Sequence, residues 1–450
     1  MSALMTLSEL ARCVGARDVR GDSRLGFSSV STDTRTLASG ALYVAIRGEN
    51  FDGHAFVSVA RERGASAALV ERPVADDLPQ IVVADSRRAL GVGAANWRAR
   101  FQLPVIAVAG SNGKTTVTQM ISSILEAAFG DKARLATQGN LNNEIGVPLM
   151  LWRRGRQHRA AVFEVGMNHP GEIAMLAEWV RPTVALVNNA QREHQEFMQS
   201  VEATAVENGE VIAALPLSDE GVAVFPADDT CAPIWRRLAG TRRVVDFALE
   251  SNAVVTATVE PGPEGQRLSI ATPNGVIEAR LAVGGLHNAR NALAATASAI
   301  AIGIEGRAIA AGLAAFRPVS GRGVRHTTAE GALLIDDSYN ANPDSVRAAI
   351  DLLGSLPAPR LLVLGDMGEV GQEGPAFHRE VGAYARERGI DGVLALGEQT
   401  RLAISAFGAG GVHFDAVDAL VAELRGRLHP GTTILVKGSR FMRMERVVQA

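Results

Sequence analysis

The stretch VIAVAGSNGKTTVTQMI, residues 105–121, constrains the fold of this chain more than any other. An apolar run breaks into a glycine-rich turn, a lysine and two threonines, and apolar residues then recur at helical spacing. This order of strand, turn and helix is typical of a phosphate-binding loop, in which backbone N–H groups and a helix N-terminus surround phosphate oxygens. The segment therefore predicts an α/β fold with a nucleotide site at a strand end.

The loop is a short form of this motif. The full pattern G-x-x-x-x-G-K-[ST] would place its first glycine at Val108, so the match is to G-S-N-G-K-T, which starts at Gly110. Glycines allow close backbone approach, Lys114 would neutralise the outer phosphates, and Thr115 or Thr116 would offer a hydroxyl to Mg²⁺. A glycine-rich turn with a chance lysine is the alternative. Motors, switches, kinases and ligases all use such loops, so the loop alone does not select among them.

Length and composition limit the architecture and the partners. A chain of 450 residues predicts about two to four domains. The formal net charge of -3 and the aromatic content of 5% favour neither nucleic acid nor an anionic membrane as a partner. No basic stretch leads into an apolar one at the N-terminus, and the least polar tract, NALAATASAIAIGI, is shorter than the about 20 residues of a spanning helix. We expect a cytoplasmic protein with Cys13 and Cys231 as reduced, structural thiols.

Two regions precede a predicted linker. Residues 1–103, the N-terminal region, predict short strands and helices, beginning with the capping box TLSE. In residues 104–316, the central region, AVFEVGM and TVALVNN are continuous apolar strands of the buried parallel kind, and IAMLAEWV between them has helical spacing. We therefore expect a doubly wound α/β domain, to which residues 243–283 add antiparallel strands.

The C-terminal region, residues 317–450, begins with RPVSGRG, which has the proline and glycines of a linker. ALLIDDS, RLLVLGD, GVLALG and TILVKGS then predict a second α/β series whose strand ends carry acids, glycines and a lysine. Asn342-Pro343 predicts the start of a helix. Ligands collect at the carboxyl ends of strands in such sheets, so two of these faces on either side of a linker predict a cleft between mobile domains.

Polar side chains stand where the central strands end. Glu164 lies inside the apolar strand AVFEVGM, where a carboxylate is costly unless it is paired with a basic residue or holds a cation. A phosphate loop one strand away favours Mg²⁺. His194 follows the next strand in the acidic loop REHQEF, and it is either a surface or capping residue or a third group around metal and phosphate.

Other candidates lie further along the chain. In GLHNARNALAA, Asn288 is placed to cap a helix, and Asn291, one turn on, can read an adenine edge. Arg322 and Arg325, in a glycine-rich hinge, would clamp phosphate once the domains close, or would simply be solvated. Carboxylates that end strands of the C-terminal region suit ribose hydroxyls or a metal: Asp336, Asp337 and Asp366.

These stretches together resemble the Mur ligase family, the ATP-dependent amide-bond-forming enzymes of bacterial cell-wall precursor synthesis. The matching segments span residues 31–445 in order: STDTRTLASGALYVAIRGENFDGHAF, GSNGKTT, GNLNNEIGVP, FEVGMNHPGEI, LVNNAQREH, GLHNARNALAA, DDSYNANPDSV, LGDMGEVG and KGSRFMRME. Two of them, GNLNNEIGVP and SYNANPDS, are specific to the family member that adds D-alanyl-D-alanine.

The resemblance implies three α/β domains: residues 1–103 for the UDP-muramoyl peptide, residues 104–316 as a P-loop ATPase, and residues 317–450 as a Rossmann-like domain. It implies a ligase that joins D-alanyl-D-alanine to UDP-N-acetylmuramoyl-tripeptide through an acyl phosphate, giving the pentapeptide, ADP and phosphate. ATP and Mg²⁺ are the implied cofactors. We expect a monomer, with neither nucleic acid as a partner nor insertion into a membrane.

The resemblance also assigns roles by position. The residues expected to act on the reacting groups are Lys114, Glu164, His194 and Arg322. The loop that holds the ATP phosphates is Gly110, Ser111, Asn112, Gly113, Lys114, Thr115 and Thr116, with Asn291 on adenine and Asp337 on ribose. The expected Mg²⁺ ligands or their supports are Thr115, Glu164 and His194. The expected substrate contacts are Ser31, Asp33, Arg35, Thr137, Asn140 and Asn143, with Asn340 and Asn342 for the dipeptide.

One position departs from the family pattern. Family members generally carry a carbamylated lysine on the helix after the histidine, where its carboxylate helps to hold a second Mg²⁺. The register from His194 places Asn208 there, and asparagine cannot form a carbamate. Our hypothesis is that Glu207, Glu210 or water alone supports the second ion. Three alternatives stay open: a ligase for another amine, a nucleotide-binding switch without turnover, and a small-molecule kinase.

Overall fold

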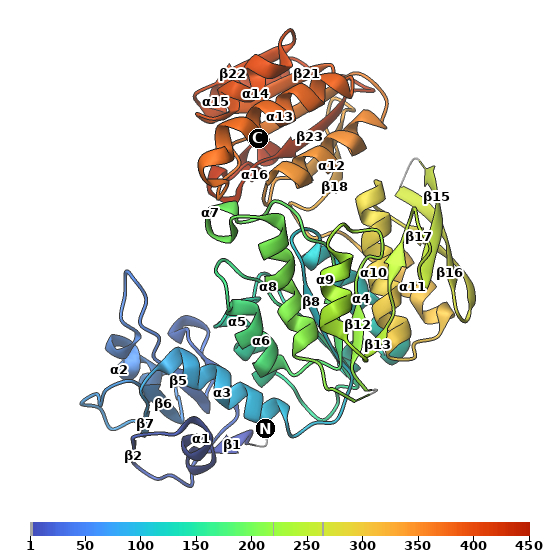
Figure 1. The fold of residues 1–450 in the computed structure, drawn as a ribbon. Helices are drawn as coiled ribbons and strands as arrows, with labels where there is room; N and C mark the ends of the chain where they lie inside the picture. Colours follow the sequence, from blue (N-terminus) through green and yellow to red (C-terminus); the bar gives the residue numbers. More distant parts are fainter. Residues whose placement is uncertain (1–2, 219, 263–264) are drawn as a thin grey trace.

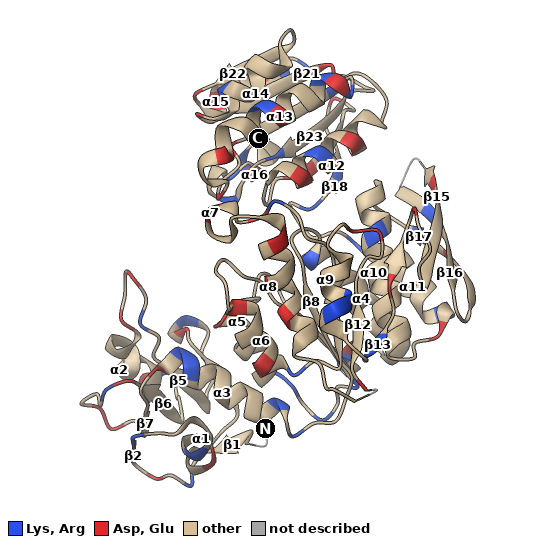
Figure 2. Cartoon of the chain, in the orientation of Figure 1, with Lys and Arg blue, Asp and Glu red and all other residues tan. Residues whose placement is uncertain are grey.

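A computed structural model describes residues 3–218, 220–262 and 265–450. Figure 1 shows three lobes that follow the chain, and Figure 2 shows acidic and basic residues in all three. The expected three-part α/β architecture is confirmed by the sheets, each of which belongs to one part of the chain. Among the described helices, none has both the length and the apolar character needed to cross a membrane.

The N-terminal region is built on a five-stranded sheet with the order β2-β7-β6-β5-β4. Its strands are β2 (Asp18–Arg20), β4 (Ser29–Ser31), β5 (Ala41–Val44), β6 (Ala67–Val70) and β7 (Gln80–Val82), and a small pair is formed by β1 (Met5–Thr6) and β3 (Gly26–Phe27). Its helices are α1 (Leu7–Val14), α2 (Val57–Glu62) and α3 (Ser86–Arg98). The predicted capping box is present, because Thr6 Oγ1 accepts from the Glu9 N–H and the Glu9 carboxylate accepts from the Thr6 N–H.

The central region contains a six-stranded parallel sheet with the order β13-β12-β11-β8-β10-β9. Its strands are β8 (Val105–Ala109), β9 (Arg134–Ala136), β10 (Ala160–Glu164), β11 (Val184–Val187), β12 (Val222–Val224) and β13 (Arg243–Val244). Because β8 lies between β10 and β11, the loops that follow these three strands meet at one edge of the sheet. This is the place where α/β sheets bind ligands.

Helices cover both faces of this sheet. They are α4 (Lys114–Phe129), α5 (Gly146–Trp152), α6 (Glu172–Val180), α8 (Val201–Ala213), α9 (Ala232–Ala239) and α10 (Leu286–Ala301). Two further helices of this region lie off the sheet: α7 (Gln195–Met198) contacts α8, and α11 (Gly306–Ala315) packs on α4 and β17. The predicted helix–strand alternation, with IAMLAEWV as a helix, is confirmed by α6 between β10 and β11.

The prediction for residues 243–283 is only partly correct. Residues 243–244 form β13, which extends the main sheet in parallel with β12. The second sheet has the order β14-β15-β16-β17, and its strands are β14 (Phe247–Ala248), β15 (Val255–Gly262), β16 (Gly265–Thr272) and β17 (Gly275–Leu281). Only β15, β16 and β17 are antiparallel, since β14 pairs in parallel with β15. The chain passes from β13 to β14 without a turn signal, which is why strand direction could not be assigned from the pattern.

The C-terminal region has a six-stranded sheet with the order β18-β19-β23-β20-β21-β22. Its strands are β18 (Val324–Thr327), which is antiparallel, and β19 (Leu333–Asp337), β20 (Arg360–Gly365), β21 (Gly392–Leu396), β22 (Gly411–Phe414) and β23 (Thr433–Lys437). The helices are α12 (Pro343–Gly354), α13 (Gly374–Glu387), α14 (Thr400–Phe407), α15 (Val417–Arg425) and α16 (Glu445–Gln449). The predicted start of α12 is confirmed, with the Asn342 side chain accepting from the Ser345 N–H at 2.9 Å.

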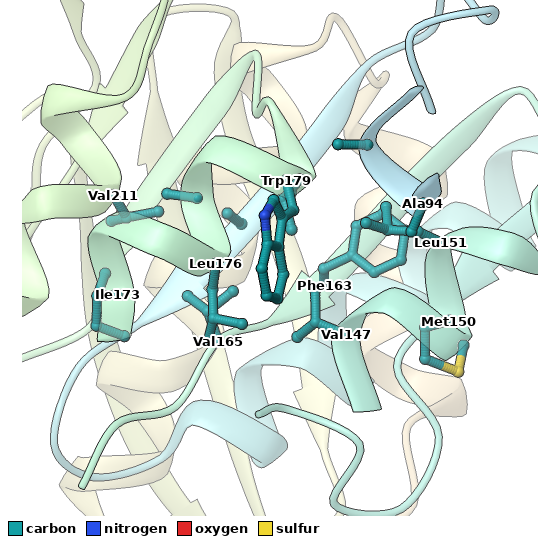
Figure 3. Close-up of a cluster of buried hydrophobic side chains, with 14 of the residues drawn as sticks. Ala94, Val147, Met150, Leu151, Phe163, Val165, Ile173, Leu176, Trp179 and Val211 are labelled. Atoms are coloured by element: carbon teal, nitrogen blue, oxygen red, sulfur yellow. The ribbon is translucent and has the colours of Figure 1, made fainter. Parts of the chain in front are cut away.

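The hydrophobic cores show which regions are packed together. One core cluster contains buried side chains of both the N-terminal and the central region, from Met5 to Ala239. Figure 3 shows part of it, where Ala94 of α3 lies near Leu151 of α5, and Phe163 and Trp179 lie close by. The C-terminal clusters contain buried residues only between Ala332 and Val447. The first two regions therefore share a core, and the third has its own.

Candidate active site at the junction of the central and C-terminal regions

A cavity of about 830 Å³ lies at the junction of the central and C-terminal regions. Its walls come from the loops after β8, β10 and β11, from the start of α10, from the linker, and from the loop between β19 and α12. Most of the site residues predicted from the sequence line it: Ser111, Asn112, Gly113, Lys114, Thr115, Thr116, Asn140, Asn143, Glu164, His194, Asn291, Arg322, Asp337, Asn340 and Asn342. Residues far apart in the sequence are thus brought to one place.

The phosphate loop needs its second glycine for two reasons. Gly113 stands before α4 with φ of +80°, a backbone conformation that residues with a side chain rarely adopt. A Cβ there would lie 2.5 Å from Asn291 Oδ1 and 2.7 Å from Asn188 Nδ2. Asn188 Nδ2 also donates to Asn291 Oδ1 at 2.9 Å, so a small amide cluster is packed directly against the loop.

All three donors of the Lys114 ammonium are used inside the protein. They reach the backbone oxygens of Gly110 at 2.6 Å and Ser111 at 2.9 Å, and Glu193 Oε1 at 2.8 Å. Burial opposes the ionisation of Glu193, but the charges of Lys114 and His194 outweigh burial and lower the pKa of this carboxyl. A phosphate that approaches Lys114 must therefore compete with the Glu193 carboxylate.

Glu164 has the environment expected of a cation ligand. It is the last residue of β10, and only 2% of it is exposed. Its Oε1 accepts from Asn142 Nδ2 at 2.8 Å, whereas its Oε2 is buried without a partner. A bare, buried carboxylate oxygen at the mouth of a phosphate loop fits Mg²⁺. In the described residues, no group of three or more His, Cys, Asp or Glu side chains converges as a metal site, so other ligands would come from Thr115 and the nucleotide.

His194 is held between two carboxylates. Its Nδ1 lies 2.6 Å from Glu369 Oε2, and its Nε2 lies 3.5 Å from Glu193 Oε1. Burial favours the neutral ring, but the two carboxylates outweigh burial and raise the pKa of His194 to about 9. In this arrangement the ring is an imidazolium at neutral pH, which supports the site through ion pairs. It would have to lose a proton before it could bind a metal.

Asn208 contacts the phosphate loop directly. Its Oδ1 accepts from the Gly110 N–H at 2.9 Å, and its Nδ2 is buried without a partner. The neighbouring Glu207 does not face the cavity, because its two oxygens accept from the N–H groups of Gly171 and Ile173 at the start of α6. Glu210 does not line the cavity either. Of the three supports suggested for a second Mg²⁺, which were Glu207, Glu210 and water, only water is compatible with this geometry.

The asparagines of α10 differ in part from expectation. The helix begins at Leu286, so Asn288 lies within its first turn and is not its cap. Asn288 Nδ2 donates to the Gly284 oxygen at 2.8 Å, and Asn291 Nδ2 donates to Asn288 Oδ1 at 3.3 Å. Asn291 therefore supports the phosphate loop as well as facing the cavity, and its contact with adenine stays a prediction.

The carboxylates of the C-terminal region have different roles. Asp337 lines the cavity and accepts from Lys437 Nζ at 2.6 Å. Asp336 holds the linker instead, through the Gly321 N–H at 3.0 Å and the Ser338 hydroxyl. Asp366 accepts from the N–H groups at the start of α14. The expectation that Asp336 and Asp366 bind ribose or metal is therefore not supported, since their oxygens accept from the protein's own N–H and hydroxyl groups.

Arg322 of the linker and Arg325 of β18 line the cavity. Arg322 lies with its guanidinium carbon 4.1 Å from the centre of the Tyr339 ring, which is a cation–π contact. Arg325 also lines the cavity, and burial lowers its pKa. Both arginines are thus positioned at the wall where predicted phosphate contacts are required.

Four predicted substrate residues lie away from this cavity. Ser31, Asp33 and Arg35 are in the N-terminal region, where Arg35 and Asp33 form an exposed ion pair of 2.7 Å. Thr137 lies beneath Glu164, with its hydroxyl accepting from the Glu164 N–H at 2.9 Å. The structure does not bring these four together with the phosphate loop, and their role in substrate binding stays a prediction.

The sequence did not single out Arg192 and Glu193, although both contact site residues. Glu193 pairs with Lys114, as described above, and Arg192 pairs with Asp344 and Glu380 of the C-terminal region. The only signal available was the run of charges around His194 in REHQEF. A run of this kind usually indicates a solvated loop, so the partners were not foreseeable from it.

Comparisons with known proteins agree with this site. Three family models match in order: the Mur ligase family catalytic domain at residues 27–98, the Mur ligase middle domain at 108–299, and the Mur ligase glutamate ligase domain at 321–440. The UDP-N-acetylmuramoyl-tripeptide–D-alanyl-D-alanine ligase of Escherichia coli is 42% identical over 99% of this chain and 98% of its own length. The enzyme of the same name from Haemophilus influenzae is 37% identical over 98% and 96%.

Solved structures give the same result. A crystal structure of MurF from Acinetobacter baumannii matches with a TM-score of 0.92 and 33% identity, over 99% of this chain and 98% of that one. MurF ligase from Thermotoga maritima, solved in complex with ADP, has the same fold with a TM-score of 0.82 and 24% identity, over 94% and 96%. On the shared full-length sequence, the three matched domains and the common fold, this chain belongs to the Mur ligase family.

Proposed function

We propose that this protein is an ATP-dependent ligase that joins D-alanyl-D-alanine to UDP-N-acetylmuramoyl-tripeptide in peptidoglycan precursor synthesis. The products are UDP-N-acetylmuramoyl-pentapeptide, ADP and phosphate. One observation supports this most directly: Lys114, the bare carboxylate oxygen of Glu164 and the asparagine loop of residues 340–342 belong to the walls of one cavity. A phosphate donor and an incoming amine can meet there. Full-length identity to ligases of this name supports the same substrates.

The chemistry has two steps. The terminal carboxylate of the tripeptide attacks the γ-phosphorus of ATP, the bond to ADP breaks, and an acyl phosphate forms. The amine of D-alanyl-D-alanine then attacks the acyl carbon, gives up a proton, and phosphate leaves as the C–O bond breaks. Negative charge accumulates on phosphoryl oxygens in the first step, so catalysis depends on positive charge and N–H donors held in place.

The chain supplies these groups from several elements. Lys114 and the N–H groups at the start of α4 would hold the transferring phosphate, and Arg322 would contact it from the linker. Mg²⁺, held by Thr115 and Glu164, would neutralise phosphate charge. Asn340 and Asn342 would orient the dipeptide. Closure over the cavity would exclude water, which otherwise hydrolyses an acyl phosphate.

The domain roles form part of the proposal. Residues 1–103 would bind the UDP-muramoyl end of the substrate through Ser31, Asp33 and Arg35, residues 104–316 would bind ATP, and residues 317–450 would bind the dipeptide. The peptide end of the first substrate would then reach past Asn140 and Asn143 into the cavity, whose wall includes both asparagines. We propose that the enzyme acts as a monomer in the cytoplasm, where ATP and nucleotide-linked precursors are available.

The decisive assay combines ATP, Mg²⁺, UDP-N-acetylmuramoyl-tripeptide and D-alanyl-D-alanine with the purified protein. We expect phosphate release only when all three organic substrates are present, and a pentapeptide product by mass spectrometry. Lys114→Ala should abolish release, whereas Lys132→Ala, an exposed lysine outside the cavity, should not. Both meso-diaminopimelate and lysine tripeptides should be tested.

Other outcomes would favour the alternatives. A preference for another amine in a substrate panel would indicate a different ligase of the family. A stable phosphorylated product without free phosphate would indicate a kinase. ATP binding with no turnover on any substrate set would indicate a nucleotide-binding switch.

A further inference from the structure

Three consecutive residues after β11 connect the phosphate loop to the C-terminal region. Glu193 binds Lys114 of the phosphate loop at 2.8 Å. Arg192 and His194, on either side of it, bind carboxylates of the C-terminal region. A single short segment therefore contacts both the expected nucleotide site and the domain that closes over it.

Arg192 makes the largest share of these contacts. Its backbone N–H and its guanidinium reach both oxygens of Asp344, at 2.6 to 3.2 Å. The same guanidinium reaches both oxygens of Glu380, at 2.7 and 3.0 Å. The guanidinium forms a bidentate ion pair with each carboxylate, and only 22% of the Arg192 side chain is exposed. Bidentate, partly buried pairs of this kind fix geometry far better than an exposed surface ion pair.

The partners of Arg192 stand next to the loop expected to bind the dipeptide. Asp344 is the second residue of α12, directly after the asparagine loop of residues 340–342. Asn342 in that loop exchanges two hydrogen bonds with Asn112 of the phosphate loop, at 2.9 and 3.2 Å. Arg192 therefore clamps the helix whose N-cap residue, Asn342, is hydrogen-bonded to the phosphate loop.

Backbone conformation at this junction is constrained as well. His194 and Glu369, which form the ion pair beside the clamp, both have positive φ, at 50° and 57°. Residues with side chains rarely adopt this conformation, and such strain concentrates where a structure holds a functional geometry. The geometry of the junction is thus fixed by several neighbouring residues and not by a single contact.

We propose that Arg192 is a positioning residue for the amine substrate: it seats the start of α12, and with it the asparagine loop, over the phosphate loop. The amine held by that loop then faces the acyl group formed below it. The part of this inference that concerns the amine rests on the proposed function, whereas the seating of the C-terminal region does not.

The test uses the full-length protein with Arg192→Ala, Arg192→Lys and Glu380→Ala, and with Arg307→Ala as a matched control. Arg307 is an exposed arginine of α11 that pairs only with Glu305 among the described ion pairs. Two readouts are needed. The KM values for D-alanyl-D-alanine and ATP report positioning, and small-angle X-ray scattering of the substrate-free protein reports the seating of the C-terminal region.

We expect Arg192→Ala to raise the KM for D-alanyl-D-alanine by at least about tenfold, because a hydrogen-bonded charge pair between two docked surfaces is lost. The KM for ATP should change by less than about twofold, since Arg192 does not line the nucleotide walls. Scattering should show a more extended molecule. Arg192→Lys keeps the charge but loses the bidentate geometry, so its KM for D-alanyl-D-alanine should lie between those of the parent and Arg192→Ala. The double variant Arg192→Ala with Glu380→Ala should add little to the single change.

Several results would overturn the proposal. If Arg192→Ala were indistinguishable from Arg307→Ala in its KM for D-alanyl-D-alanine and in its scattering profile, a positioning role would be excluded. A fall in kcat with both KM values unchanged would exclude it too. If the unmodified enzyme had no ligase turnover, the proposed function would fail, and the seating would then be decided by scattering alone: an unchanged profile for Arg192→Ala would refute it.

Discussion

At the scale of single residues, Asn208 shows how the phosphate loop is held from below. Its side-chain oxygen accepts the Gly110 N–H, so the first glycine of the loop has its donor satisfied by α8. A buried N–H without a partner is costly, which makes an acceptor at this position a structural requirement. The departure from the family's lysine therefore has a structural role of its own in this chain.

The first prediction tests whether the side-chain oxygen of Asn208, and not its amide nitrogen, supports the phosphate loop. Asn208→Asp keeps an oxygen for the Gly110 N–H and should retain activity. Asn208→Leu has similar volume but no acceptor, and it should lower the free energy of unfolding by about 1–3 kcal/mol, the cost of an unsatisfied buried donor. ATP affinity should fall as well, because the loop loses its support. Urea unfolding and calorimetric titration with ATP measure the two effects.

The same residue predicts the dependence on carbon dioxide. Asparagine cannot be carbamylated, so the activity of the unmodified enzyme should be the same in buffers stripped of bicarbonate and in buffers supplemented with it. Clear stimulation of activity by bicarbonate would contradict this prediction. For the previous one, an Asn208→Leu variant with the stability and the ATP affinity of the parent would show that the Asn208 oxygen does not support the loop.

A second residue-scale prediction concerns His378, which is fully buried in the C-terminal region. Its Nδ1 donates to the Gly374 oxygen at 2.7 Å, and its Nε2 accepts from the Met367 N–H at 3.0 Å. The neutral ring is therefore required. Burial lowers the pKa of His378, and the hydrogen bond to Gly374 and the nearby Asp366 only partly oppose this.

The sign of the pH effect follows from this. As the pH falls through about 6.5, the histidine of the unfolded chain takes up a proton and the buried ring does not. Stability from this group is present above about pH 6.5 and is lost below it. We expect the Tm by scanning calorimetry to fall between pH 7.5 and pH 5.5. His378→Leu should be less stable at pH 7.5 but show a smaller fall, and an equal fall in both proteins would refute the assignment.

At the scale of elements, the parts that were predictable are those set by local pattern. The capping box of α1 and the Asn342 start of α12 depend on residues within one turn, and both are confirmed. The apolar strands β10 and β11 were equally evident from their composition. By contrast, the pairing of β13 depends on a strand that is distant in sequence, and α10 begins after Gly285 without a side-chain cap, so there the predictions were wrong or incomplete.

The candidate site divides in the same way. The phosphate loop and Glu164 could be found because their residue types are unusual in their immediate context. Glu193 and Arg192 could not, since their meaning depends on partners such as Asp344, 152 residues further along the chain. No periodicity or spacing reports such a pair. Only the folded arrangement distinguishes a charge at a domain junction from a charge on a solvated loop.

The packing of α3 on α6 carries a prediction at this scale. Gly91 of α3 lies against Trp179 of α6, and a Cβ at position 91 would come within 2.3 Å of the Trp179 ring. Alanine is the better helix former by about 1 kcal/mol, but forcing an extra methyl into a packed core costs about 1–3 kcal/mol. Gly91→Ala should therefore destabilise the protein in denaturant unfolding, despite its better helix propensity.

Gly354→Ala is the matched control. Gly354 is the last residue of α12, and the nearest atom to a Cβ there would be 3.4 Å away, which is an ordinary contact. We expect this variant to be neutral or slightly more stable. If Gly91→Ala behaved like Gly354→Ala, the two helices would not be packed as closely as the structure has them.

At the scale of the whole molecule, the three lobes are not equivalent. One cluster joins buried side chains of the N-terminal and central regions, from Met5 to Ala239, although each region also has a cluster of its own. The contacts that Arg192, His194 and Asn342 make at the junction with the C-terminal region are polar. Interfaces of the polar kind separate more readily than a shared hydrophobic core, so relative motion is expected at the second junction and not at the first.

Limited digestion with trypsin tests this difference, because both junctions contain arginine. The Arg317–Pro318 bond resists trypsin, so the cleavable linker site is Arg322, which is only partly buried and is followed by Gly323. At the first junction, Arg98 is buried and donates to the backbone oxygens of Val180, Phe101 and Arg181. Cleavage requires a locally open chain. Early fragments identified by mass spectrometry should therefore end in the linker, leaving residues 1–103 joined to the central region.

Ligands should protect the linker further. An ATP analogue together with UDP-N-acetylmuramoyl-tripeptide would bridge the phosphate loop and Arg322, and closure of the C-terminal region over them would reduce opening of the chain at the Arg322–Gly323 bond. The expected result is slower cleavage at the linker with unchanged fragment boundaries. First cleavage near residues 98–104, with or without ligands, would mean that the N-terminal region is the mobile one and that the shared core is weaker than its burial indicates.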